Sequence, residues 1–180
     1  FCAGANLLMV FMASKQKEWD QIEKMVARFQ SAVQGLRYST VPVVSAPFGL
    51  TLGGGAELAM AADASQAYAE TYMGLVEVGV GLVPAGGGCL RMVERWTDGL
   101  KGVEGVNPLK FIAEASLNIA MAKVSQVGAE QAKRFRLLHF TDGITLNRNH
   151  LLSHAKERAL GMARSGYREP SARSIHAAGI

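Results

Sequence analysis

The sequence predicts an α/β fold in which short strands alternate with helices, followed by a more helical C-terminal part. Two observations carry this prediction. Up to about residue 97, short runs bounded by proline or glycine alternate with stretches whose apolar residues recur at steps of three or four. After residue 106 the helical patterns follow one another, with one short strand pattern between them. Alternating strands and helices favour parallel pairing with right-handed crossovers.

The first predicted helix is the stretch "KEWDQIEKMVARFQSAVQGLRYS". Its apolar residues form one face, which we expect to pack in the core: Trp19, Ile22, Met25, Val26, Phe29, Val33 and Leu36. Pro42 prevents the helix from continuing. The β-branched run "VPVVSAPFG", bounded by Pro42 and Pro47, predicts a short buried strand.

The remaining elements follow from the same patterns. A triple glycine precedes a helix over about 55–62, and a glycine-rich loop follows the end of a strand in "VGVGLVPAGGG". The other predicted segments are an extended stretch over 64–74, helices over 89–96, 107–124 and 128–138, a turn and short strand over 140–147, and a helix over 149–166.

Composition excludes several classes of protein. The chain has 180 residues, of which 49% are hydrophobic and 19% charged, which suits one compact domain rather than a disordered chain. No apolar run reaches the ~18–20 residues of a membrane span. The net charge of +4 comes without a basic stripe interleaved with aromatics, so we expect no nucleic-acid partner. Two distant cysteines, Cys2 and Cys89, favour a reducing cytoplasm.

The stretch "LTLGGGAELAMAAD" places three glycines against the start of a helix. The first N–H groups of a helix have no partner within it, and the helix dipole favours negative charge there. Glycine has no Cβ, so a ligand can approach those N–H groups closely. Gly53–Gly55 therefore fit an anion or a developing oxyanion. A tight, closely packed strand-to-helix turn explains the glycines equally well.

Two isolated carboxylates suggest acid–base chemistry. Glu57 lies in the first turn of that helix among apolar neighbours, so it is either a capping carboxylate or a paired or functional group. Glu77 is the only charged residue in the stretch "TYMGLVEVGVGLVP" and lies 20 residues further along. That spacing allows one strand excursion and return, so the two side chains can converge. Burial would then raise the pKa of at least one of them.

Three stretches resemble the motifs of the crotonase superfamily, also called the enoyl-CoA hydratase/isomerase family. They are "FCAGANL", "PVVSAPFGLTLGGGAELAMAAD" and "YMGLVEVGVGLVPAGGG". These blocks follow the family's order at fitting distances and cover most of residues 1–91. The later stretch "GAEQAKRFRLL" also resembles a helix that follows the family's active-site half.

The resemblance implies a crotonase-like superhelix of stacked ββα turns, with the N-terminal strands missing, followed by C-terminal helices. Residues 1–100 would form the core with the active-site motifs, residues 101–170 a helical part and residues 171–180 a loosely ordered tail. It also implies a homo-oligomer, either a trimer or a dimer of trimers. Ala5 would lie near a free end, which leaves open whether the chain by itself is active.

The resemblance further implies an acyl-CoA or enoyl-CoA thioester as the substrate. The N–H groups of Ala5 and Gly54 would bind the thioester oxygen. Glu57 would mainly activate a water molecule, and Glu77 would deliver or remove the proton at C2. The other positions with which the resemblance associates substrate binding are Ala3, Asn6, Leu7, Gly53, Val76 and Leu82.

The presence of both glutamates favours a hydratase over a Δ3-Δ2 enoyl-CoA isomerase. A thioesterase and a non-catalytic binding or assembly module are further hypotheses that the sequence leaves open. The stretches "SAPFG", "ETYMGLVEVGVGLVP" and "ITLNRNHLL" most resemble the crotonase domain that is joined to a 3-hydroxyacyl-CoA dehydrogenase in bacterial β-oxidation proteins.

No cofactor is expected in this domain, and NAD only where a dehydrogenase domain accompanies it. The stretch "GVGLVP" has Pro84 where a dinucleotide-binding motif needs its third glycine. His150 and His154 lie one helical turn apart. We expect a solvated helix face there rather than a zinc site, because no third ligand is evident.

Overall fold

The computed structural model describes residues 1–100 and 103–171, and it confirms the α/β class. Most of the predicted tail, residues 172–180, lies outside the described residues. Two small parallel sheets are present. One has the order β1 (Val44–Ser45), β3 (Ala64–Tyr68), β5 (Gly143–Thr145), and the other pairs β2 (Gly49–Leu52) with β4 (Thr71–Gly74).

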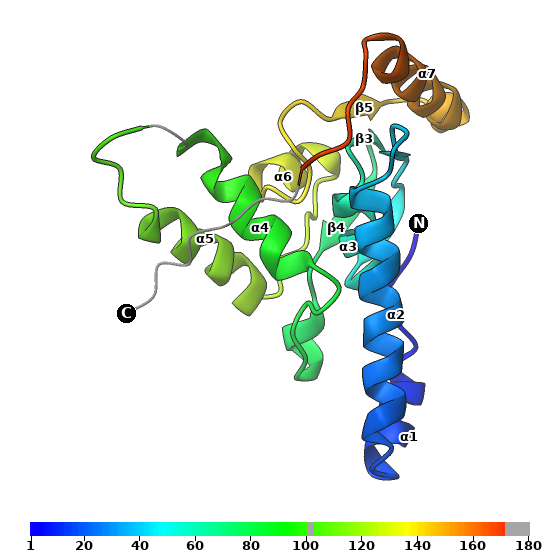
Figure 1. The fold of residues 1–180 in the computed structure, drawn as a ribbon, viewed down its shortest axis with the longest axis vertical. Helices are drawn as coiled ribbons and strands as arrows, with labels where there is room; N and C mark the ends of the chain where they lie inside the picture. The colour runs from blue at the N-terminus through cyan, green and yellow to red at the C-terminus, as the bar shows by residue number, and fades with distance from the viewer. Residues whose placement is uncertain (101–102, 172–180) are drawn as a thin grey trace.

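Helices surround these sheets (Figure 1). The α-helices are α1 (Leu7–Lys15), α2 (Trp19–Arg37), α3 (Gly54–Ala61), α4 (Gly88–Thr97), α5 (Leu109–Ala120), α6 (Ala129–Arg134) and α7 (Leu151–Arg164). Short 3₁₀ turns are η1 (Glu77–Val80), η2 (Asp98–Leu100) and η3 (Arg148–His150). Among the described residues, no helix combines the length and apolar character that crossing a bilayer requires.

The hydrophobic core lies where α3, α4 and β4 meet. Its largest fully buried side chains include Met60 of α3, Met73 of β4 and Met92 of α4, together with Leu75 and Leu138. The alanines of α3 pack into the same cluster, so α3 is buried nearly all round. This burial fixes α3 firmly, and with it the triple glycine at its N-terminus.

Two of the predicted strand patterns are wrong in extent. Within 41–49 only Val44–Ser45 form a strand, because Pro42 and Pro47 have no N–H to donate to a neighbouring strand. The expected strand end after Glu77 is the 3₁₀ turn η1. The N–H of Gly79 donates a hydrogen bond to the carbonyl of Val76, and the N–H of Gly81 donates one to the carbonyl of Val78. The backbone groups of this turn therefore pair with one another rather than with a neighbouring strand.

The sequence patterns do not predict helix α1. Its residues, "LLMVFMASK", are apolar on every side, so they lack the periodic pattern that marks an amphipathic helix. The signal that could have found it is Asn6. The side chain of Asn6 accepts hydrogen bonds from the N–H groups of Leu8 and Met9 at 3.1 and 3.4 Å, as an N-cap residue does.

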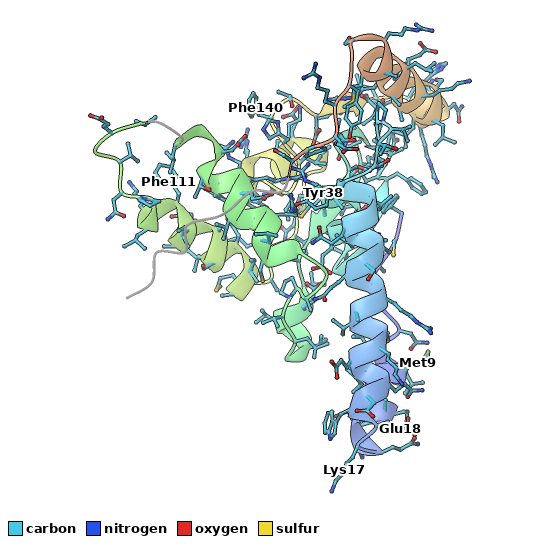
Figure 2. All side chains as sticks on the ribbon, viewed as in Figure 1. Met9, Lys17, Glu18, Tyr38, Phe111 and Phe140 are labelled. Atoms are coloured by element: carbon cyan, nitrogen blue, oxygen red, sulfur yellow. The ribbon has the colours of Figure 1, made fainter. Side chains whose placement is uncertain are left out.

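The apolar face of α2 does not lie in the core as expected. Val33 is buried, but Trp19 is 59% exposed. The apolar residues of α2 between these two positions line a cavity that is described below. The N-terminal part of α2 extends beyond the sheets, with α1 packed beside it (Figure 1). Lys17 and Glu18 mark the tip of this α1–α2 hairpin, with Met9 nearby on α1 (Figure 2).

The glycine at position 55 is required by a close backbone contact, and this contact can be tested. A Cβ at Gly55 would lie 2.1 Å from the carbonyl oxygen of Cys2. We expect Gly55→Ala to lower the free energy of unfolding by about 1–3 kcal/mol, because backbone must move to relieve the overlap. Thermal or urea unfolding measures this loss.

Gly35→Ala is the matched control. Gly35 lies in α2 with nothing within 4 Å of the Cβ position. This substitution is expected to stabilise the protein by about 0.5–1 kcal/mol, because alanine favours the helix. Equal effects of the two substitutions would contradict the close contact at Gly55.

Candidate active site

The N-terminal segment of the chain crosses the start of α3. The N–H of Leu52 donates to the carbonyl of Cys2, and the N–H of Gly53 donates to the carbonyl of Gly74, both at 2.9 Å. Gly4 has a φ of +98°, and its Cβ position lies 3.4 Å from the nitrogen of Gly54. The left-handed backbone at Gly4 therefore brings the segment against the first residue of the helix.

Gly54 is the first residue of α3, so its N–H has no carbonyl partner within the helix. Gly53 caps the helix with a φ of +53°. Ala5 follows Gly4, so its peptide lies beside this helix start. Two peptides from distant parts of the chain thus meet at the positive end of the helix dipole, an arrangement suited to an anionic oxygen.

Glu57 is buried one turn further along α3. Its side chain is only 3% exposed, and Oε1 accepts a hydrogen bond from the N–H of Gly88 at 2.8 Å. Burial raises the pKa of Glu57, while backbone hydrogen bonds from Gly88 and Gly86 oppose this rise. The carboxyl group therefore holds its proton more strongly than an exposed glutamate does.

Glu77 lies across from the same helix start. A Cβ at Gly53 would be 3.1 Å from Oε1 of Glu77. Burial raises the pKa of Glu77, and the charge of the nearby Glu57 adds to this rise, whereas backbone hydrogen bonds at Glu77 and Val76 oppose it. Oε2 of Glu77 is a buried atom without a hydrogen-bond partner among the described residues. A buried carboxyl oxygen without a partner is uncommon, because an unpaired polar atom away from water costs free energy.

Both carboxylates open into one cavity of about 500 Å³. The structure brings nearly all of the sequence-predicted positions to its wall: Ala3, Ala5, Leu7, Gly53, Gly54, Glu57, Val76, Glu77 and Leu82. Asn6 does not line the cavity, because its side chain caps α1 instead. The convergence predicted from the spacing of the two glutamates is therefore present.

Sequence reasoning missed the wall that α2 contributes. The side chains of Ile22, Met25, Val26 and Phe29 line the cavity. The helical spacing of these residues predicted a core face, and the same spacing serves a cavity equally well. Reasoning from sequence also missed that Gly86 and Gly88 of the stretch "PAGGG" surround Glu57, although the unusual run of glycines marks that position.

The pair formed by His150, at the end of η3, and His154 of α7 lies outside this cavity. The rings of His150 and His154 stack at 5.8 Å, and Nδ1 of His154 lies 3.0 Å from the hydroxyl of Thr145. Within residues 1–100 and 103–171, no three His, Cys, Asp or Glu side chains gather in a way that could hold a metal ion.

The family model of the enoyl-CoA hydratases and isomerases matches residues 1–97. The chain belongs to this family. A Bacillus subtilis protein named "Probable 3-hydroxyacyl-CoA dehydrogenase" is 42% identical over 170 residues, which are 94% of this chain and 21% of that protein. The mouse methylglutaconyl-CoA hydratase is 36% identical over 92 residues, which are 51% of this chain and 28% of that protein.

Solved structures of this family agree with the fold. The enoyl-CoA hydratase of Bacillus anthracis superposes with a TM-score of 0.62 at 25% identity, over 80% of this chain and 48% of that chain. An enoyl-CoA hydratase of Polaromonas gives a TM-score of 0.67 at 21% identity, over 90% and 55% respectively. The chain thus spans about half the length of these structures and a smaller share of the curated relatives.

The raised pKa of Glu57 predicts a dependence of stability on pH. The ordinary pKa is 4.5, and the folded value is higher, so the unfolded chain ionises first as the pH rises. The free energy of unfolding contributed by Glu57 therefore falls from about pH 4.5 upward, until the pH passes the folded pKa. We expect Glu57→Gln, which cannot ionise, to gain stability relative to the wild type as the pH rises.

Urea unfolding at about pH 4 and about pH 7.5 measures this difference. Glu23→Gln, at an exposed position on α2, is the matched control for the loss of one carboxylate. A stability difference between Glu57→Gln and the wild type that stays constant with pH would contradict the raised pKa.

Proposed function

We propose that this domain adds water to the double bond of a trans-2-enoyl-CoA thioester. The observation that carries the proposal is the pair of carboxyl groups on one cavity beside the N-terminus of α3, Glu57, which is buried, and Glu77, which is half-buried. Hydration needs a base for the water and an acid for the adjacent carbon. Two neighbouring carboxyl groups with raised pKa values can supply both, one as the ionised base and the other as the protonated acid.

The thioester oxygen would lie at the start of α3. There the N–H groups of Ala5 and Gly54 would donate hydrogen bonds to it. Attack at C3 moves negative charge onto this oxygen, and the helix dipole stabilises charge at that end. Interactions that strengthen as charge develops lower the barrier rather than only binding the substrate.

In the proposed addition, one glutamate takes up a proton and the other gives one up. Ionised Glu57 would take a proton from water as the water oxygen bonds to C3. Protonated Glu77 would give its proton to C2, so that one water is added in total. Mutual repulsion favours a state in which only one of the two carboxyl groups is ionised. Exchange with solvent then restores the starting state.

The apolar wall of the cavity fits the acyl part of such a substrate. Leu7 and Val10 come from α1, and Ile22, Met25 and Val26 come from α2. Apolar side chains would remove the acyl chain from water, which favours binding by about 25 cal/mol for each Å² buried.

Two Rickettsia relatives named as fatty acid oxidation complex enzymes suggest a place for this activity in fatty acid β-oxidation. Hydration produces a 3-hydroxyacyl-CoA, which is the substrate named for the Bacillus subtilis relative. We propose that the domain acts as the hydratase part of a longer protein with that dehydrogenase, in which NAD would belong to the dehydrogenase part. The hydration itself changes no oxidation state overall, so it needs no redox cofactor. Trimer formation and a cytoplasmic location stay predictions.

Substitution of either carboxylate tests the proposal. Glu57→Gln and Glu77→Gln are each expected to lower kcat for hydration of a short trans-2-enoyl-CoA by ~10²–10⁴-fold, because each removes one proton carrier. Loss of the ultraviolet absorbance of the conjugated thioester measures the rate. Glu23→Gln is expected to leave the rate unchanged, because Glu23 is exposed on α2 away from the cavity.

Other substrates separate the competing reactions. Conversion of a 3-enoyl-CoA into its 2-enoyl isomer without hydration would support an isomerase, and release of free thiol would support a thioesterase. No turnover of any thioester, by protein that still binds acyl-CoA, would support a binding module. Each of these outcomes would overturn the hydratase proposal.

A further inference from the structure

Two consecutive residues of α2 contact two consecutive residues of the glycine loop 85–88. The side-chain amide nitrogen of Gln30 donates a hydrogen bond of 2.7 Å to the carbonyl oxygen of Ala85. The ring of Phe29 occupies the space beside Gly86, where a Cβ would lie only 2.1 Å from a ring carbon. Thus α2 holds the loop by one polar contact and one apolar contact.

The same loop holds Glu57. The N–H of Gly88 donates to Oε1, and the Cβ position of Gly86 is 2.6 Å from Oε2. Phe29 and the Oε2 atom of Glu57 therefore lie on the same side of Gly86. A shift of the loop would alter the hydrogen bond of Glu57 and its exposure to water together.

We propose that Gln30 is a positioning residue that fixes the glycine loop, and through the loop the carboxyl group of Glu57. Gln30 is exposed and does not line the cavity, so it acts only through Ala85. Glycine loops have many accessible conformations, so the hydrogen bond at Ala85 removes part of that freedom in addition to the contact of Phe29 with Gly86. The inference rests on the proposed hydratase activity for its kinetic consequences, but its structural consequence can be measured without turnover.

The groups around Glu57 determine how its pKa should respond to loss of the hydrogen bond between Gln30 and Ala85. Within the described part of the chain, the charge of Glu57 raises the pKa of two neighbouring groups, Glu77 of η1 and Cys89 of α4. The side chains with which α2 faces the cavity, Ile22, Met25, Val26 and Phe29, are uncharged. The hydrogen bond from Gly88 lowers the pKa of Glu57, so weakening it should raise that pKa further.

Gln30→Met tests the inference, because methionine has a similar length and no N–H donor. We expect kcat to fall roughly 3–10-fold with little change in KM, which is the size of effect that one lost hydrogen bond gives. The acid limb of the pH–rate profile should move to higher pH. Gln30→Lys keeps an N–H donor, so its kcat should be closer to that of the wild type than the kcat of Gln30→Met.

Gln34→Met is the matched control, at an exposed position one turn further along α2. It should leave kcat and the pH profile as in the wild type. Equal kinetics of Gln30→Met and the wild type, in a protein that does hydrate enoyl-CoA, would overturn the inference while leaving the proposed function intact.

Amide NMR keeps the test independent of activity. The N–H signal of Gly88 reports the ionisation of Glu57, to which it is bonded. In Gln30→Met its titration midpoint should move to higher pH, and its hydrogen exchange should quicken, whereas Gln34→Met should change neither. If wild-type protein shows no hydration but these shifts occur, the proposed function fails and the positioning role stands. An unchanged Gly88 signal in Gln30→Met overturns the positioning role in either case.

Discussion

The site depends on a carboxylate that is buried without a cation. Glu57 is 3% exposed, and neither of the ion pairs found among the described residues includes it. A buried carboxyl group in this position must be satisfied by backbone N–H groups, and its pKa rises because burial costs the charged form more. The N–H of Gly88 therefore both provides this carboxyl group with a hydrogen bond and limits the rise of its pKa.

Glycine allows the close contacts around this site in two places. At the start of α3, Gly4 and Gly55 let the N-terminal segment lie directly against the helix, where a Cβ at Gly55 would overlap Cys2. The missing side chain of Gly86 leaves room for the ring of Phe29 and the carboxyl group of Glu57. In both places the absence of a Cβ is what allows the close approach.

Much of this site could be predicted from the sequence, because its signals are local. Glu57 and Glu77 are isolated charges in apolar stretches, and the triple glycine precedes a helix directly. Helix α1 lacks any polar face, so periodicity could not reveal it, and Asn6 became a cap rather than a cavity residue. The contact of Gln30 with Ala85 joins residues 55 positions apart. Such a contact leaves no local pattern, because an exposed glutamine on a helix is ordinary.

The role of α2 shows why periodicity and function are hard to separate. Its apolar face buries Val33 at one end and lines the cavity along Ile22, Met25 and Val26 at the other. The cavity end extends beyond the sheets and has α1 as its neighbour (Figure 1). At this end Trp19 is 59% exposed, whereas Val33 at the other end is 3% exposed. Under the proposed function, an acyl chain in the cavity would remove part of this apolar face from water.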